Sequence, residues 1–345
     1  MDEKKDKKKI TFADIAKYTN FSKTTISRYF NNPDSLTIEN QEIIAKALTD
    51  LDYKENKLAK VFANGKSEFV GIIVPNLYLH YYAEMLNQIL NTYETYGYKF
   101  LIFTSKSGEE AERKYLHELL AYRIEGMIIL SHTLPSKELA DCGIPVVGIE
   151  REDQYINSVN TDNYMGAVQA TSLLIKNRCD VLLHINSMVA KDVPSYGRIR
   201  GFLDTCSEYG IRHELIQRDL GHSHKQIHAS MSEVYTYIKE KYPHQKKGLF
   251  LSNDTHANSM LNTIVREHGG WPDEYRMIGF DDSPAASQAI FPISTIGQQI
   301  DKIACEAMSL LVALMEEQKK RRPKPQTELV HKNITPVFIR RETTD

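Results

Sequence analysis

Four polar side chains stand where short apolar runs end, and their chemical types suit hydrogen bonding to a small ligand. Glu150, Asn253 and Asp281 each lie at or just past the end of such a run, and Arg198 opens a polar stretch after another. Carboxylates and an arginine fork bind paired sugar hydroxyls or clamp an anionic group. For two neighbouring carboxylates, capping of a helix N-terminus is an equally open role: Asp254 and Asp282.

Aromatic side chains are concentrated in residues 76–82, which follow the first apolar run of the region after residue 68. If this segment is a loop at the end of a strand, its tyrosine rings can stack on the faces of a sugar. Asn76, Tyr81 and Tyr82 are therefore candidate ligand contacts, and the choice of which tyrosine faces the ligand stays open.

A second group of polar residues has the composition of a helix that contacts DNA. Ser22 is a good N-cap, and residues 23–28 carry short polar and cationic side chains of the kind that reach base edges and phosphates in a major groove. The side chains expected to face the groove are Lys23, Thr24, Thr25, Ser27 and Arg28.

The elements around this helix predict a helix-turn-helix. Ile15 and Ala16 before it, and Ile26 and Phe30 within it, fall at helical spacing on faces that can pack together. Residues 19–21 supply a tight turn between the two helices.

A third amphipathic helix is predicted over residues 38–50, after a turn at residues 32–35. Its apolar face is expected to comprise Ile43, Ile44, Ala47, Leu48 and Leu51.

From Phe69 onward, short apolar runs alternate with amphipathic stretches, which predicts an α/β fold. Runs at 70–74, 100–104, 126–130 and 146–150 predict four buried parallel strands of one lobe. A second lobe is predicted from strands at 181–186, 249–252 and 277–280, with helices near 163–176, 196–209, 225–240 and 254–268. Two doubly wound lobes bind ligands outside the carboxyl ends of their strands.

The residue types and the order of these segments resemble those of the lactose/galactose repressor (LacI/GalR) family of bacterial transcriptional regulators. The resemblance rests on the head, on residues 159–167, on Arg198-Ile199-Arg200-Gly201-Phe202 and on Ser252-Asn253-Asp254. It continues through Ile278-Gly279-Phe280-Asp281-Asp282-Ser283 and the closing residues 338–344.

The resemblance implies an N-terminal all-α helix-turn-helix head and two doubly wound parallel-sheet lobes of the periplasmic-binding-protein type. We expect a DNA-binding domain at 8–54, a hinge helix at 55–66 and an effector-binding core at 67–345. Lobe one is expected at about 67–160 and 297–325, and lobe two at about 161–296 and 326–341.

The hinge segment 55–66 has helical spacing but is too short to hold as an isolated helix in water, so we expect disorder without DNA. In the resembled family it folds in the minor groove and inserts a leucine into a base step. Phe62 stands at that position here, and phenylalanine is an accepted apolar wedge. The alternative is that Phe62 packs on the first lobe.

These arguments give two predicted sets of contact residues. The DNA-contacting set is Thr11, Lys23, Thr24, Thr25, Ser27, Arg28 and Asn31 in the head and Asn56, Lys57, Ala59 and Phe62 in the hinge. The effector-contacting set is Asn76, Tyr81, Tyr82, Glu150, Arg198, Asn253, Asp281 and Gln298.

Charge and composition fit a protein that touches nucleic acid at one end. The 345 residues carry a net charge of −2; residues 1–66 hold 13 basic against 10 acidic side chains, a net of +3, which leaves −5 for the rest. No apolar segment approaches the ~20 residues of a membrane span, and no secretory signal is evident. We expect a cytoplasmic protein. Four scattered cysteines favour neither disulfides nor a thiolate zinc site.

Three competing functions are less favoured. His222, His224 and His228 lie close together, but no Cys or Glu ligands accompany them, so solvated histidines are favoured over a metal site. No catalytic motif such as Gly-x-Ser-x-Gly or HExxH is present, so neither an enzyme nor a cofactor is expected. A sugar-binding protein without a transcriptional role would explain the lobes but not the head.

The sequence therefore predicts a ligand-responsive transcription regulator, most simply a repressor. Its expected partners are double-stranded operator DNA, a small carbohydrate or related metabolite, and a second copy of the chain. A homodimer is expected because one helix-turn-helix has a small footprint and palindromic operators match two-fold symmetry.

Overall fold

The computed structural model describes residues 10–54, 67–105, 108–323, 326 and 328–345, and the chain divides into two compact units, residues 1–66 and 67–345. The predicted hinge contacts Asn56, Lys57, Ala59 and Phe62 lie outside the described residues.

The N-terminal unit contains α1 (Phe12–Thr19), α2 (Lys23–Asn31), η1 (Pro33–Ser35) and α3 (Ile38–Asp50). Asn20 ends α1 in the left-handed conformation, φ 61°, and so forms the predicted turn. The buried core is small and comprises Ile15, Ala16, Ile26 and Ile44, and Ala47 of α3 is buried as well. The predicted apolar face of α3 was wrong at Ile43, which is 42% exposed because it lies beside rather than on the face that meets α1 and α2.

The first sheet of the core unit has the strand order β11-β5-β4-β3-β1-β2, and all its pairings are parallel. Its strands are β1 (Phe69–Val74), β2 (Lys99–Thr104), β3 (Gly126–Ile129), β4 (Val146–Ile149), β5 (Asn157–Thr161) and β11 (His331–Ile334). The helices of this lobe are α5 (His80–Asn91), α6 (Tyr93–Tyr96), α7 (Glu109–Ala121), α8 (Ser136–Ala140) and α14 (Ile300–Gln318).

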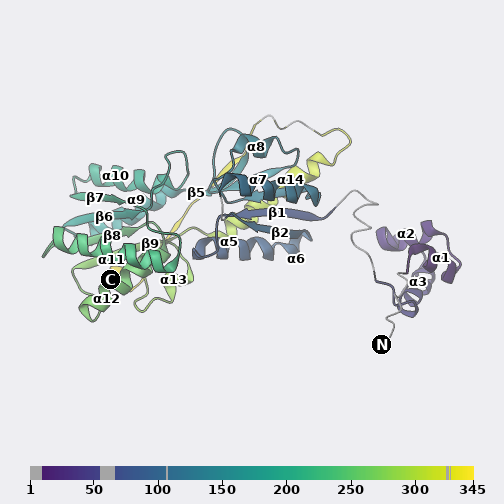
Figure 1. Ribbon diagram of the computed structural model, residues 1–345, viewed down its shortest axis with the longest axis horizontal. Coiled ribbons are helices and arrows are strands. Elements are labelled where there is room, and N and C mark those ends of the chain that lie inside the picture. The colour runs from purple at the N-terminus through teal and green to yellow at the C-terminus, as the bar shows by residue number, and fades with distance from the viewer. Residues whose placement is uncertain (1–9, 55–66, 106–107, 324–325, 327) are drawn as a thin grey trace. The chain divides into compact units, whose positions relative to one another are not determined.

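The second sheet has the order β12-β10-β9-β8-β6-β7, with β12 antiparallel to β10. Its strands are β6 (Val181–Asn186), β7 (His213–Gln217), β8 (Lys247–Leu251), β9 (Tyr275–Asp281), β10 (Ser294–Gly297) and β12 (Val337–Ile339). Its helices are α9 (Asn163–Lys176), α10 (Tyr196–Glu208), α11 (His224–Lys241), α12 (Asp254–His268), α13 (Pro284–Ser287) and η2 (Glu342–Thr344). Figure 1 shows helices on both faces of each sheet.

The two doubly wound lobes confirm the predicted α/β class, and the buried apolar strands explain them. Strands β1, β3, β4, β6 and β8 are buried along nearly their whole length, as expected when helices cover both faces of a parallel sheet.

The C-terminal segment differs from the prediction. Residues 326–341 were expected in lobe two, but β11 pairs with β5 in the first sheet, and only β12 joins the second. Polar contacts hold β11 beside β5. The Ser158 hydroxyl lies 2.8 Å from Nδ1 of His331, and the Asn157 side chain accepts from the Val330 amide. Such specific hydrogen bonds leave no hydrophobic signature in the sequence.

The chain passes between the lobes three times, at residues 161–163, 297–300 and 334–337. The three passages are joined by hydrogen bonds. The Asp162 amide donates to the Ile334 carbonyl over 3.0 Å, the Gln299 side chain donates to the Thr335 carbonyl over 2.5 Å, and the Thr161 hydroxyl donates to Gln298.

Candidate functional site

A cavity of the core unit collects polar side chains from the carboxyl ends of strands in both lobes. Its volume is about 150 Å³, below the ~300–1,000 Å³ of pockets for drug-sized ligands, so it suits a small molecule. Of the predicted effector contacts, it brings together Tyr81, Tyr82, Glu150, Arg198, Asn253, Asp281 and Gln298.

Asn76 does not line the cavity. Its side-chain oxygen instead accepts a hydrogen bond of 3.2 Å from the Leu79 amide, and this contact shapes the turn before α5. An asparagine in a loop often serves the backbone in this way.

Glu150 and Arg198 are linked through one amide side chain. The Nδ2 atom of Asn163 donates to Oε2 of Glu150 over 2.9 Å, and its Oδ1 atom accepts from Nε of Arg198 over 2.7 Å. The other Glu150 oxygen accepts from the Thr161 amide over 3.1 Å. The two charged groups, one from each lobe, are thus held apart at fixed positions.

The Arg198 guanidinium is anchored on three sides. Nε is held by Asn163, Nη1 donates to the Ser252 carbonyl over 2.5 Å, and Cζ lies 3.7 Å from the centroid of the Phe280 ring. Arginine stacked on an aromatic face keeps its planar donors in a defined direction. Nη2 remains for a ligand.

Asp281 lies at the end of β9 and is nearly fully buried. Its Oδ1 atom accepts from Nε2 of Gln298 over 2.6 Å. Burial raises the pKa of Asp281 to about 7, although Arg198 and the hydrogen bond from Gln298 oppose this shift. Its backbone φ of 122° is rare for a residue with a side chain.

Asp254 is also fully buried, and it is a structural group behind the cavity. It accepts from the Ser283 amide over 2.7 Å and from the Thr295 hydroxyl over 2.6 Å. Burial and the neighbouring charge of Asp281 raise its pKa well above the usual range. Asp282, the other carboxylate with an open role, forms an ion pair with Arg341.

Asn253 has two roles available. Its Oδ1 atom accepts from the His256 amide over 2.9 Å and so caps α12. This hydrogen bond leaves the Nδ2 donor of Asn253 for the cavity.

The two tyrosines of α5 lie edge to face, with ring centroids 5.2 Å apart. Tyr81 is 7% exposed, and its buried hydroxyl has no hydrogen-bond partner in the described part of the chain. Burial raises the pKa of both phenols, with Glu150 adding to the shift, so both are neutral donors. An unsatisfied buried hydroxyl costs about 1–3 kcal/mol, so a ligand that accepts from Tyr81 would recover that cost.

Several cavity residues were missed by the sequence analysis. Three of them, Asn186, Ser187 and Ser252, lie at or just past the ends of β6 and β8, so the strand-end rule that found Glu150 could have found them too. The other two, His132 and Ser195, lie in longer loops.

Asn186 is fixed by a buried histidine. Nδ1 of His184 lies 2.9 Å from the Phe250 carbonyl, and its Nε2 atom lies 3.2 Å from Nδ2 of Asn186. Because burial lowers the pKa of His184 to about 4, the ring is neutral, donates at Nδ1 and accepts at Nε2. The amide oxygen of Asn186 is then free to accept from a ligand.

In the head, α2 presents three exposed side chains without hydrogen bonds or ion pairs to the residues described: Lys23, Thr24 and Arg28. The other predicted contacts have local partners. Thr25 bonds to Ser22, which caps the helix over 3.0 Å, and Asn31 donates to Ser27 over 3.2 Å. Thr11 is the N-cap residue before α1, and its amide donates to Asp14 over 2.8 Å.

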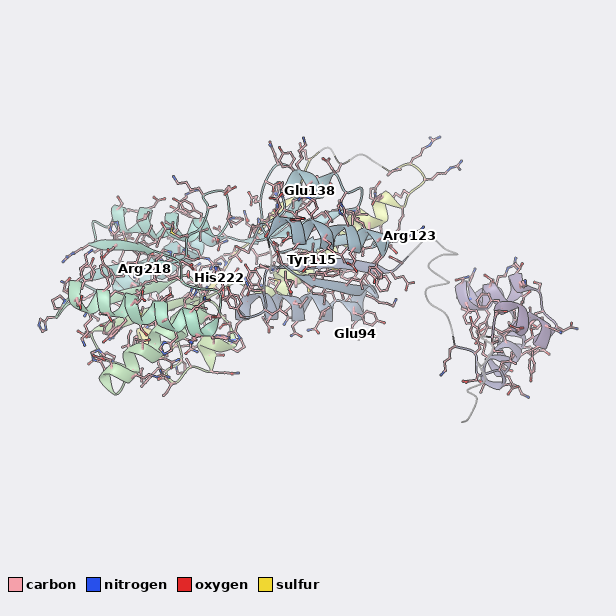
Figure 2. The ribbon with its side chains drawn as sticks, in the orientation of Figure 1. Glu94, Tyr115, Arg123, Glu138, Arg218 and His222 are labelled. Carbon is pink, nitrogen blue, oxygen red and sulfur yellow. The ribbon has the colours of Figure 1, made fainter. Side chains whose placement is uncertain are left out.

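Neither a metal cluster nor a membrane helix is found in the described ranges. No group of three or more His, Cys, Asp or Glu side chains there could hold a metal ion, and His222, labelled in Figure 2, lies exposed before α11. No helix among those residues is long and apolar enough to cross a bilayer.

Known proteins of similar sequence include a domain family and several operon repressors. Residues 173–344 match the model of a periplasmic binding protein-like domain. The ribose operon repressor of Halalkalibacterium halodurans is 26% identical over 312 residues, 89% of this chain and 91% of the relative. The sucrose operon repressor of Streptococcus mutans is 26% identical over 306 residues, 88% and 92% of the two chains.

Among solved structures, the lac repressor dimer bound to operator and the anti-inducer ONPF matches with a TM-score of 0.81 and 20% identity. The match covers 98% of this chain and 99% of that one. The fold is therefore shared from the head to the C-terminal strands. Over nearly its whole length the chain is therefore similar to operon repressors, and it shares the fold of the lac repressor.

Proposed function

We propose that this chain is a sequence-specific DNA-binding transcriptional repressor whose affinity for its operator is controlled by a small carbohydrate or related metabolite. The observation that carries the proposal is the presence, on one chain, of a helix-turn-helix with exposed polar side chains on α2 and a polar cavity between two lobes. The relatives named as ribose and sucrose operon repressors support a sugar effector.

The chemistry of the cavity suits a polyhydroxylated ligand. Asp281, Glu150 and Asn186 offer acceptors, and Arg198, Tyr81 and Asn253 offer donors. A sugar hydroxyl both donates and accepts, so adjacent hydroxyls can satisfy such mixed groups at once.

The proposed regulation is a shift between conformations. A ligand that contacts both lobes favours their closed arrangement, and only a difference in affinity between two arrangements can change binding to DNA. Two heads of a homodimer would bind the two halves of a palindromic operator. The protein is expected to act in the cytoplasm, where operator DNA lies, and without enzymatic activity.

The test uses a duplex that the full-length protein itself selects from random DNA, in gel-shift assays at fixed salt. D-ribose, sucrose, D-glucose, cellobiose and their available phosphates form the effector panel, first scored by the shift they cause in melting temperature. Selection of a palindromic sequence, with an affinity changed by a panel sugar, supports the proposal. A protein that binds sugars but selects no DNA sequence would be a sugar-binding protein without a transcriptional role.

A further inference from the structure

The loop that follows β3 is held by two buried charged side chains of opposite sign. Glu112 of α7 is fully buried, and Arg151, just after β4, is 7% exposed. The region comprising Glu112, Arg151 and residues 131–136 is called the β3 loop clamp below.

Arg151 satisfies the carbonyl groups of this loop. Its Nη1 atom donates to the Ser131 carbonyl over 2.6 Å, its Nη2 atom donates to the Leu134 carbonyl, and Nε donates to the Ser136 hydroxyl over 2.7 Å. An arginine fork that donates in three directions to one loop defines the path of that loop.

Glu112 satisfies donors of the same loop. Its Oε2 atom accepts from the Ser131 hydroxyl over 2.6 Å, and its Oε1 atom accepts from the Leu134 amide over 3.4 Å. Removing Glu112 would leave the Ser131 hydroxyl and the Leu134 amide without their acceptor, and removing Arg151 would leave the Ser131 and Leu134 carbonyls without their donor. Arg151 also lies 3.8 Å from Asp153, which compensates part of its charge.

The clamp presents His132 to the cavity. His132 lines the cavity on the side of the first lobe, and neither of its ring nitrogens has a hydrogen-bond partner among the residues that the structure describes. Of its two neighbours in the chain, Ser131 donates to Glu112, and Thr133 lies 3.0 Å from the Ser131 hydroxyl. Hydrogen bonds therefore hold the backbone on both sides of His132, and its imidazole ring is available for a ligand.

We propose that His132 is a ligand-contacting, specificity-determining residue of the cavity and that Glu112 and Arg151 are its positioning residues. This inference rests on the proposed function of the cavity as the effector site.

The electrostatic surroundings of His132 favour a neutral ring. The side chain of His132 is exposed to solvent; partial desolvation by its neighbours and the positive charge of Arg151 lower its pKa below the ordinary value, against the opposing effect of Asp192. A neutral imidazole both donates and accepts, and so matches a hydroxyl. The cation of Arg151 thus has two effects, on the path of the loop and on the charge of the ring.

The first experiment needs no ligand. The full-length protein is labelled with ¹³C at the histidine Cε1 atoms, and the signal of His132 is assigned by its loss in His132→Asn. In the wild type the midpoint of this signal lies below the ordinary value of about 6.5, and in Arg151→Gln it moves toward that value. A midpoint that is the same in both proteins overturns the proposed positioning by Arg151.

The second experiment measures Kd by calorimetry for each panel sugar that raises the wild-type melting temperature. His132→Ala weakens binding about tenfold, as expected of one lost hydrogen bond, and His132→Asn recovers part of the loss. Glu112→Gln and Arg151→Gln weaken binding similarly, while DNA binding is retained. An unchanged Kd in His132→Ala overturns the inference.

Two matched controls separate positioning from general damage. Arg113→Gln removes an arginine of α7 whose partners are Glu109 and Glu138, the latter labelled in Figure 2. His117→Asn changes an exposed histidine on the same helix. Both should bind sugar as the wild type does. If no panel sugar binds the wild type, the proposed effector class is wrong, and the titration of His132 still decides the placement of the ring.

Discussion

The side chain of Gln298 donates to Oδ1 of Asp281 over 2.6 Å and accepts, at its own oxygen, from the hydroxyl of Thr161. Thr161 ends β5 of the first sheet, and Asp281 ends β9 of the second. Gln298 is 1% exposed, so this bridge between the lobes forms part of the cavity wall. A ligand that binds Asp281 must compete with Gln298 or join it.

Protonation of Asp281 should make stability depend on pH. Its folded-state pKa of about 7 lies above the ~3.9 of an unfolded aspartate, so the native state holds more protons between these values. The stabilising contribution of Asp281 to the free energy of unfolding is fully present below the unfolded pKa and is lost as the pH rises to about 7. Between the two pKa values the free energy of unfolding falls by at most ~1.4 kcal/mol per pH unit. Urea unfolding at pH 5 and pH 8 should show a smaller change in Asp281→Asn than in the wild type; equal changes would contradict the raised pKa.

Arg198→Ala should abolish the response to effector and leave DNA affinity intact. The substitution leaves Asn163 Oδ1 and the Ser252 carbonyl without their donor, at about 1–3 kcal/mol for each unpaired group. If the effector is an inducer, repression becomes permanent. Arg200→Ala, which removes an exposed arginine from the same helix, is the control. Calorimetry that finds full-strength sugar binding to Arg198→Ala would exclude this residue from the site.

Exposed side chains of α2 should determine the preferred DNA sequence. Lys23→Ala or Thr24→Ala should relax base preference at one or two positions, at about 1–3 kcal/mol for each lost contact. Arg28→Ala, if Arg28 binds phosphate, should weaken all sequences alike. Lys46→Ala on α3 is the matched control for lost charge. Identical operator selection by all of these variants would show that α2 does not contact bases.

Phe62, in the segment outside the described residues, is predicted to act as an apolar wedge in the minor groove. Phe62→Ala should reduce both operator bending, measured by circular-permutation gel shifts, and specific affinity, with sugar binding unchanged. An unchanged bend together with a lower melting temperature of the protein would indicate packing on the first lobe instead.

Gly201 allows α9 and α10 to pack closely. A Cβ atom added there would lie 2.5 Å from the Tyr164 carbonyl oxygen and 2.8 Å from the Ala167 side chain. Gly201→Ala should therefore lower the free energy of unfolding by about 1–3 kcal/mol. Gly270→Ala, where the added atom meets nothing within 4 Å, should be near neutral in the same denaturation assay. Equal stability of the two variants would refute the close approach.

The sequence predicted those parts of the fold that depend on burial of apolar side chains. Helices at 163–176 and 254–268 were located to the residue, and each begins directly after a side chain that caps its N-terminus, Asp162 and Asn253. Strand β5 was missed: it is fully buried but largely polar, and is satisfied by distant partners such as His331 and Gln326. Hydrogen bonds between residues far apart in sequence have no local pattern.

The residues of the candidate site likewise fall into those that the local sequence could locate and those whose position depends on distant residues. Glu150, Asp281 and Arg198 were found because strand ends can be located from the chain alone. His132 was missed because its position depends on Glu112, which lies on a different helix, and on Arg151 after the next strand. Asn76 was included for its residue type, and its amide serves the backbone of its own turn instead.

The three passages between the lobes restrict how the lobes can move. Two bodies joined by one segment can twist, slide and bend independently. Three connecting segments that are hydrogen-bonded to one another, through Asp162 to Ile334, Gln299 to Thr335 and Thr161 to Gln298, oppose twisting and sliding more than bending. A ligand that contacts both lobes would therefore act mainly on one relative movement, and the size of the shift would be set by the difference between its affinities for the two arrangements.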